Sequence, residues 1–122
     1  MLALIVEDVP EMRLLMEEML RQLGFEVRSA GNLAEAHLEL GRHRPDVLFL
    51  DEVLPGEIAL SLLDALGDDP LPVFLITGME EKGAAERSLP DGVIARLEKP
   101  SWKRLDVDRE RFKAALKSLT PS

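Results

Sequence analysis

The chain contains no cysteine, and only 4% of its residues are aromatic. Without cysteine there can be no disulfide framework, thiol nucleophile or thiolate metal site, so a bound metal must take oxygen or imidazole ligands. No apolar run approaches the roughly 20 residues that a membrane-spanning helix needs, and the N-terminus lacks the basic start and cleavage site of a signal peptide. We therefore expect a cytoplasmic protein that does not bind membranes.

Basic residues are also scarce. Fifteen lysines and arginines stand against 23 acidic residues, which gives a formal charge of −8. Because no local basic patch offsets this charge, direct binding to nucleic acid is not expected. The 122 residues, 46% hydrophobic and 31% charged, are typical of an ordinary soluble domain, and we expect residues 1–122 to form a single one.

Short apolar runs alternate along the chain with amphipathic stretches of helical spacing. This alternation predicts an α/β fold, a doubly wound five-stranded parallel sheet with the flavodoxin-like strand order 2-1-3-4-5. Runs that are apolar at every position indicate inner strands, at 2–6, 47–50 and 73–76. Runs that include charges indicate edge strands, at 25–30 and 93–98. The predicted helices occupy 10–23, a segment after Asn32, 57–66, a short segment within 80–92, and 104–119.

Polar residues stand where four of the predicted strands end. Glu7 and Asp8 follow the first strand, Asp51 the third, Thr77 the fourth and Lys99 the fifth. In sheets of this kind ligands bind beyond the carboxyl ends of the strands, where the strand order reverses direction. The three carboxylates should therefore converge between the first and third strands, with Thr77 and Lys99 on the rim.

Three neighbouring carboxylates repel one another unless a positive charge lies among them. Oxygen ligands of this kind suit Mg²⁺, which commonly binds one or two carboxylates together with a phosphate. Lys99 could then hold the charge of the phosphate while Thr77 donates its hydroxyl, as in phosphoryl transfer to an aspartate. Each carboxylate alone could equally be a solvated loop charge, and Asp8 could cap the first helix.

Four motifs carry a family resemblance that covers almost the whole chain: "LIVEDVPEMRLLMEEML", "VLFLDEVLPG", "VFLITG" and "RLEKPS". In their order and spacing they resemble the CheY-like receiver domains of two-component response regulators. The resemblance implies that Asp51 accepts a phosphoryl group from a sensor histidine kinase, a phosphotransfer protein or a small acyl phosphate. It further implies that Asp8, Asp51 and the backbone carbonyl of Val53 bind Mg²⁺ directly, and that Glu7 acts through bound water.

The resemblance also gives the remaining motif residues roles. Lys99 would contact the phosphoryl oxygens, Thr77 would turn towards them after transfer, and the bond before Pro100 would be cis. The output surface would comprise the helix within 80–92, the strand at 93–98 and the helix at 104–119. A downstream protein or a fused output domain would read that surface. Such a domain, a monomer or weak dimer, catalyses only its own phosphorylation and dephosphorylation.

Several positions depart from the family pattern. Arg96 stands where the family usually carries an aromatic switch residue, so it either reaches an acidic partner in the output or is a solvated edge-strand arginine. Trp102 is most simply a partly buried packing residue, or else a partner contact near Lys99. Val53 and Met79 are apolar at positions that tune the lifetime of the phosphoryl group in relatives, so we expect slow hydrolysis.

Other functions remain open at this point. A receiver-like interaction module that never uses phosphate is favoured by the missing aromatic and opposed by Asp8, Asp51, Thr77 and Lys99. A Mg²⁺-dependent phosphatase acting on external substrates would need a second acid where Val53 stands. A flavin-binding protein would need a hydroxyl- or glycine-rich phosphate loop, and "EDVPE" is the opposite. The sequence names neither the kinase, the pathway nor the downstream target.

Overall fold

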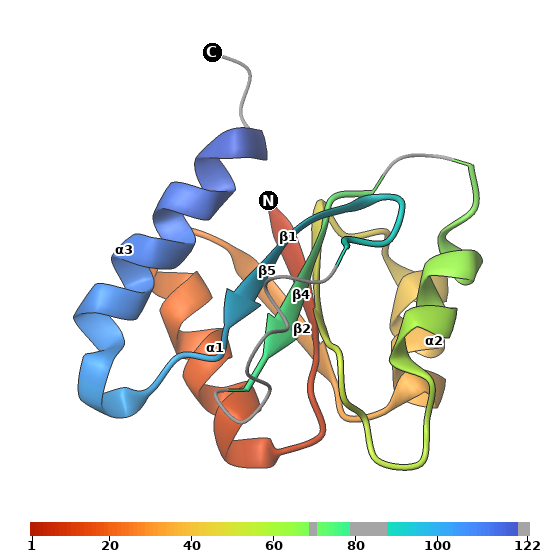
Figure 1. Cartoon of the computed structure of the whole chain (residues 1–122), viewed down its shortest axis with the longest axis horizontal. Coiled ribbons are helices and arrows are strands. Elements are labelled where there is room, and N and C mark those ends of the chain that lie inside the picture. The colour runs from red at the N-terminus through yellow and green to blue at the C-terminus, as the bar shows by residue number, and fades with distance from the viewer. Residues whose placement is uncertain (69–70, 79–87, 120–122) are drawn as a thin grey trace.

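The computed structural model describes residues 1–68, 71–78 and 88–119. Its five strands form one parallel sheet in the order β2-β1-β3-β4-β5, which confirms the predicted topology (Figure 1). The order reverses direction between β1 and β3, so the carboxyl ends of these two strands flank the crevice where a ligand can bind. The strands are β1 Leu2–Val6, β2 Glu26–Ala30, β3 Val47–Asp51, β4 Val73–Thr77 and β5 Val93–Glu98.

Helices cover both faces of the sheet. Helices α1 (Pro10–Gln22) and α3 (Leu105–Leu116) pack on one face, and α2 (Leu33–Arg42) and the 3₁₀ helix η1 (Ala59–Leu66) pack on the other (Figure 1). Two shorter 3₁₀ helices, η3 (Trp102–Arg104) and η4 (Lys117–Leu119), flank α3. No helix in the described part of the chain is both long and apolar enough to cross a bilayer.

The inner strands are apolar because both of their faces are covered. Every residue of β3 and β4 is buried, as the uninterrupted apolar runs predict. On the α1/α3 face, the ring of Phe49 stacks against those of Phe74 and Phe112, with centroids 5.5 and 5.9 Å apart. This aromatic stack ties β3, β4 and α3 together beneath the end of β3 that carries Asp51.

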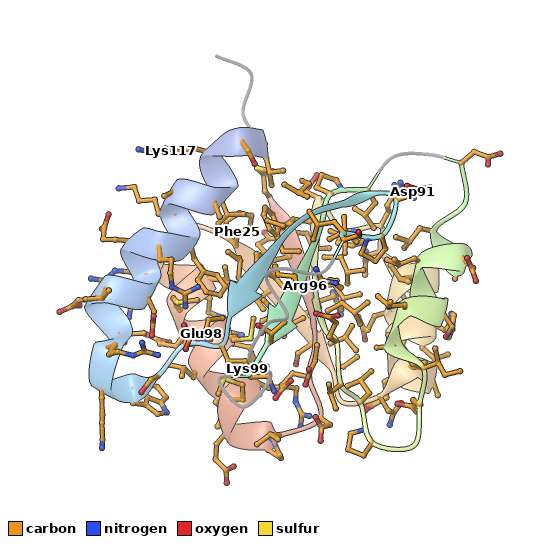
Figure 2. The ribbon with its side chains drawn as sticks, in the orientation of Figure 1. Phe25, Asp91, Arg96, Glu98, Lys99 and Lys117 are labelled. Atoms are coloured by element: carbon orange, nitrogen blue, oxygen red, sulfur yellow. The ribbon has the colours of Figure 1, made fainter. Side chains whose placement is uncertain are left out.

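The edge strands, which each pair with only one other strand of the described sheet, carry charged residues. In β2 the exposure alternates, and β5 admits Arg96 and Glu98. Lys99 directly follows the end of β5. Arg96 and Lys99 are therefore both positioned by this edge strand (Figure 2). The predicted edge positions of both strands are therefore confirmed.

The helix ends follow their local sequence. Pro10 occupies the first turn of α1, and Gly24, with φ of +99°, follows the end of that helix. The Asn32 side chain accepts a hydrogen bond of 2.8 Å from the Glu35 amide and caps α2. Asp8 does not cap α1, because the N-cap residue is Val9 and no side chain bonds to the first turn.

Two helix predictions differ from the structure. The α-helix predicted at 57–66 is instead the 3₁₀ helix η1, whose N-cap residue, Ile58, has no side-chain acceptor for the first amides. The helix predicted at 104–119 is divided between α3 and the flanking 3₁₀ turns. The helix predicted within 80–92, and Met79, fall on or overlap residues 79–87, which lie outside the described part of the chain.

Candidate functional site

Three carboxylates meet at the carboxyl end of the sheet, as the sequence predicts. Glu7 directly follows β1, Asp8 comes next, and Asp51 is the last residue of β3. Each offers one carboxylate oxygen, and these three oxygens lie within 4.8 Å of one another. Glu7 and Asp51 are each only 1% exposed, whereas Asp8 is partly exposed. The cluster is therefore closed on the protein side and open at Asp8.

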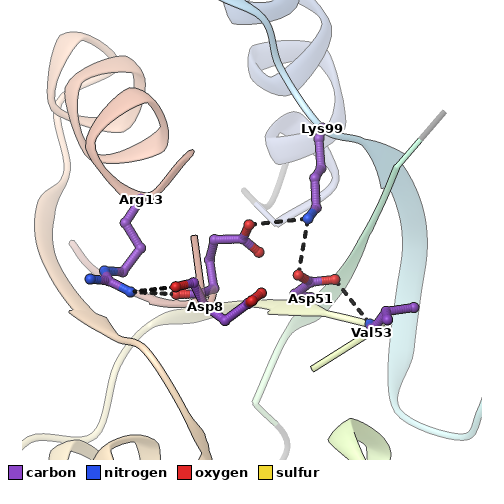
Figure 3. Close-up of polar contacts among 6 residues, drawn as sticks. Asp8, Arg13, Asp51, Val53 and Lys99 are labelled. Carbon is purple, nitrogen blue, oxygen red and sulfur yellow. Dashed lines mark hydrogen bonds and ion pairs between the residues drawn. The ribbon is translucent and has the colours of Figure 1, made fainter. Parts of the chain in front are cut away.

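Lys99 lies between two of these carboxylates. Its Nζ is 3.0 Å from Oδ2 of Asp51 and 3.1 Å from Oε1 of Glu7 (Figure 3). The Lys99 amide donates a hydrogen bond of 2.8 Å to the carbonyl oxygen of Thr77, which fixes the direction in which the lysine leaves β5. In this arrangement the ammonium group neutralises part of the charge of the cluster.

Burial and neighbouring charge shift the pKa values of this cluster. Burial, followed by the hydrogen bonding and negative charge of Asp51, raises the pKa of Glu7 from 4.5 to about 8, against an opposing effect of Lys99. Burial acts to lower the pKa of Lys99, but hydrogen bonds and charge from Asp51 and Glu7 outweigh it and raise that pKa above 10.5. The site therefore has one lysine charge for three carboxylates and favours a proton on Glu7.

The chemistry of this cluster fits a divalent cation. Oε2 of Glu7 is buried and has no hydrogen-bond partner, although a buried oxygen of this kind is normally satisfied. Carboxylate oxygens are the hard ligands that Mg²⁺ prefers, and a few carboxylates with retained water are its usual protein ligands. The donor set and the unpartnered oxygen therefore match the predicted Mg²⁺ site.

Asp51 is held by both of its oxygens. While Lys99 binds Oδ2, the backbone amide of Val53 donates a hydrogen bond of 2.9 Å to Oδ1 (Figure 3). Thr77 ends the adjacent strand β4 and is 8% exposed. The structure thus gathers the predicted residues at one edge of the sheet. The roles predicted for the Val53 carbonyl and the Thr77 hydroxyl stay predictions.

Arg13, which was not singled out from the sequence, holds the backbone of the loop that carries Glu7 and Asp8. Its Nη1 donates hydrogen bonds to the carbonyl oxygens of Glu7 and Asp8, at 2.8 and 3.3 Å (Figure 3). A Cβ atom at Gly31 would lie 2.8 Å from the same nitrogen, so glycine leaves the space that the guanidinium occupies. A cation in the first turn of a helix opposes the helix dipole, and that anomaly was the available signal.

Arg96 is not the solvated edge-strand arginine of one interpretation, and the output role of the other interpretation stays a prediction. Its Nε lies 2.8 Å from Oε1 of Glu52, and its side chain is only 7% exposed. It therefore forms a buried pair within the domain and is not a solvated arginine. Glu52 was not singled out from the sequence, although its position directly after Asp51 and in phase with buried Leu50 was a usable signal.

Two further predictions near Lys99 were wrong. The described residues include no cis peptide bond, so the bond between Lys99 and Pro100 is trans. The lysine is directed instead by the hydrogen bond that its backbone amide donates to the Thr77 carbonyl and by its ion pairs. Trp102 is 59% exposed and does not pack into the core. It lies in the 3₁₀ helix η3, and the alternative interpretation, a partner contact, stays a prediction.

Asp108 holds the corner that follows Lys99. Its carboxylate is 1% exposed, accepts a hydrogen bond of 2.8 Å from the Ser101 amide and pairs with Nη2 of Arg111 at 3.1 Å. The same Nη2 donates to the carbonyl oxygen of Glu98, at 2.6 Å. Helix α3 is thereby held against the segment 98–101, and Asp108 was not singled out from the sequence.

Known proteins share this sequence and fold. Over 100 residues the chain is 32% identical to protein-glutamate methylesterase/protein-glutamine glutaminase 1 of Anaeromyxobacter dehalogenans, covering 80% of this chain and 29% of that protein. Over 121 residues it is 31% identical to the response regulator PleD of Caulobacter vibrioides, covering 96% and 25%. The crystal structure of NtrX from Brucella abortus with ATP matches with a TM-score of 0.80 and 28% identity, covering 97% of this chain and 27% of that one.

The chain spans less than a third of the length of these relatives, so the similarity concerns only part of each. Residues 3–108 match the family model described as the response regulator receiver domain. That match includes the acidic cluster, Thr77 and Lys99, all at the carboxyl edge of a sheet with the expected strand order. The chain therefore belongs to the response regulator receiver domain family of two-component systems.

Proposed function

We propose that residues 1–122 act as one receiver domain in which Asp51 accepts a phosphoryl group with the help of Mg²⁺. The observation that carries the proposal is the position of Lys99, 3.0 Å from Asp51 and 3.1 Å from Glu7 within an acidic cluster that fits a divalent cation. A lysine placed there can bind the oxygens of an incoming phosphoryl group, because it already stands beside the atom that would receive it.

The transfer is a substitution at phosphorus. A carboxylate oxygen of Asp51 forms a new bond to phosphorus, while the bond from phosphorus to the nitrogen of a kinase histidine, or to the oxygen of an acyl phosphate, breaks. The leaving imidazole or carboxylate keeps the electron pair of the broken bond. The bonds from Lys99 and the Val53 amide hold Asp51 in one orientation, which lowers the entropic cost of reaching this geometry.

Glu7, Asp8, Asp51 and the backbone carbonyl of Val53 would hold the magnesium ion, Glu7 through water. When bound, Mg²⁺ neutralises the charge that builds up on the transferring phosphoryl oxygens. Glu7 would give up its proton on metal binding, because a nearby cation favours the ionised form of a carboxylate even across a bridging water. Thr77 would donate its hydroxyl to the phosphoryl group after transfer.

The donor would be a sensor histidine kinase or phosphotransfer protein, with a small acyl phosphate as an alternative source. Phosphorylation would then change which protein, or which fused output domain, binds the surface formed by β5, α3 and the segment before β5. The acidic composition of the chain supports protein partners over nucleic acid. We expect a monomer or weak dimer in both states.

The proposal is tested by the intact mass of the protein after incubation with acetyl phosphate and Mg²⁺. We expect the mass to increase by one phosphoryl group in the wild type and in Asp64→Asn, a matched change at an exposed aspartate. No increase is expected for Asp51→Asn or when a chelator removes Mg²⁺. Absence of the increase in the wild type, with acetyl phosphate and with purified kinases, would contradict the proposal and favour a phosphate-independent interaction module.

A further inference from the structure

A second buried ion pair lies beside the phosphorylation site, on the other face of the sheet. Arg96 of β5 contacts Glu52 through two bonds, Nε to Oε1 at 2.8 Å and Nη2 to Oε2 at 3.3 Å. Both side chains are almost fully buried, at 7% and 8% exposure. Strands β3 and β5 are not neighbours, because β4 lies between them. This pair therefore reaches across β4.

The alternation of side chains places the two ion pairs of this region on opposite faces. Phe49 and Leu97 pack into the core beneath α1 and α3, and Leu50 packs into the core beneath α2 and η1. Because successive side chains of a strand point to opposite faces, Asp51 shares the face of Phe49 and Glu52 the face of Leu50. Lys99 therefore binds Asp51 on one face of the sheet, and Arg96 binds Glu52 on the other.

The buried pair is a strong and specific constraint. A guanidinium group that contacts both oxygens of one carboxylate fixes orientation as well as distance. Loss of one partner would leave the other as a buried charge without this compensation, which is far more costly than loss of a surface pair. The end of β3 and the middle of β5 should therefore move as one unit.

Each end of the pair also connects to further structure. Glu52 stands between Asp51 and Val53, and the Val53 amide binds Oδ1 of Asp51 at 2.9 Å. At the other end, Nη2 of Arg96 donates a hydrogen bond of 3.2 Å to the carbonyl oxygen of Ser88. A continuous chain of contacts thus runs from the oxygen of Asp51, through the pair, to the segment that precedes β5.

We propose that Glu52 and Arg96 are positioning residues that couple the loop carrying Val53 to β5 and to Ser88. The inference rests on the proposed phosphorylation of Asp51. It adds a route by which this chain, which lacks the family's usual aromatic switch residue, transmits the effect of phosphorylation to β5. The pair sets the placement of the Val53 backbone towards the metal. In return, a change in that loop on phosphorylation alters the segment 88–98.

Coupling of this kind must act in both directions, which defines two readouts. The first is the Kd of Mg²⁺, measured by calorimetric titration of the unphosphorylated protein. The second is the rate of amide hydrogen exchange in residues 88–98, with and without Mg²⁺ and beryllofluoride, a noncovalent mimic of the phosphoryl group. Neither readout would change if the pair contributed only to global stability, provided that each variant is fully folded during the assay.

The test uses Arg96→Gln, Arg96→Lys and the double variant Glu52→Gln with Arg96→Gln, which removes both charges of the pair together in case the single variant fails to fold. The matched control is Arg28→Gln. Arg28 lies on the opposite edge strand, β2, and pairs with Glu39 at 3.4 Å, but its side chain is 45% exposed. This control therefore removes an edge-strand arginine and its ion pair without touching the chain of contacts to Asp51.

We expect the Kd of Mg²⁺ to be about tenfold higher in the double variant, since removal of groups that support metal ligands typically weakens binding 10- to 100-fold. Arg96→Lys should give an intermediate value because it keeps the charge but loses the two-pronged contact. The exchange response of residues 88–98 to beryllofluoride should be lost in the double variant and retained in Arg28→Gln.

An unchanged Kd of Mg²⁺ together with an unchanged exchange response in the double variant would overturn the inference while leaving the phosphorylation of Asp51 intact. A wild type that gains no phosphoryl group would instead refute the proposed function itself. A change in only one readout would also overturn the inference, because coupling must be reciprocal.

Discussion

Replacing Glu7 by glutamine should change how the stability of the protein depends on pH. In the metal-free protein, the pKa of Glu7 is raised to about 8 because its carboxylate is buried and lies beside Asp51. In the unfolded chain the same group titrates near its ordinary value of 4.5. Between these two values the folded state retains a proton that the unfolded state has lost, so raising the pH favours unfolding.

The size of this effect follows from the two pKa values. Each pKa unit corresponds to about 1.4 kcal/mol, so a rise from 4.5 to about 8 could lower the free energy of unfolding by up to roughly 5 kcal/mol between pH 4.5 and pH 8. A typical domain has a free energy of unfolding of about 5–15 kcal/mol, so this loss would be a large part of it. In Glu7→Gln the contribution should disappear, because the side chain no longer titrates.

The assay is urea denaturation at a series of pH values from 5 to about 8.5, in the presence of a chelator, on wild type and Glu7→Gln. Glu110→Gln, at an exposed position, serves as the control and should keep the wild-type slope. Addition of Mg²⁺ should raise the stability of the wild type most at high pH, because the ion favours the ionised form of the nearby Glu7 carboxylate. Equal pH slopes for wild type and Glu7→Gln would refute the reasoning.

Three further changes test other parts of the structure. Asp108→Asn should lower the free energy of unfolding by about 2–3 kcal/mol in chemical denaturation, because the charged acceptor for the Ser101 amide is lost. Gly31→Ala should displace the Arg13 guanidinium, whose Nη1 lies 2.8 Å from the new Cβ, and should weaken Mg²⁺ binding in calorimetric titration. Phe112→Ala should cost about 3–5 kcal/mol of stability in the same denaturation assay, because it empties one side of the aromatic stack.

The fold and the main cluster could be predicted from local patterns. Uninterrupted apolar runs marked the inner strands, charged runs marked the edges, and polar residues after four strands marked the carboxyl edge of the sheet. These patterns follow from which strands are buried and from the parallel direction of the strands. The strand order then places the carboxyl ends together, so the convergence of Glu7, Asp8, Asp51 and Lys99 could be predicted.

The missed features depend on pairings between distant residues. Glu52 and Arg96 are 44 positions apart, and only the three-dimensional register brings them together across β4. Asp108 and Ser101 meet because a corner in the chain turns the start of α3 back towards β5. Charged residues of this kind read as surface in a linear sequence, since burial of an ion pair leaves no periodic signal.

Locating the phosphoryl group tests the central claim most directly. Hydroxylamine converts an acyl phosphate into a hydroxamate, and peptide mass mapping then identifies the modified residue. After treatment with acetyl phosphate and Mg²⁺, we predict a single hydroxamate on Asp51, the carboxylate held by Lys99 and the Val53 amide. A hydroxamate on Glu7, Asp8 or any other residue, or none despite a gain of phosphate, would contradict the account.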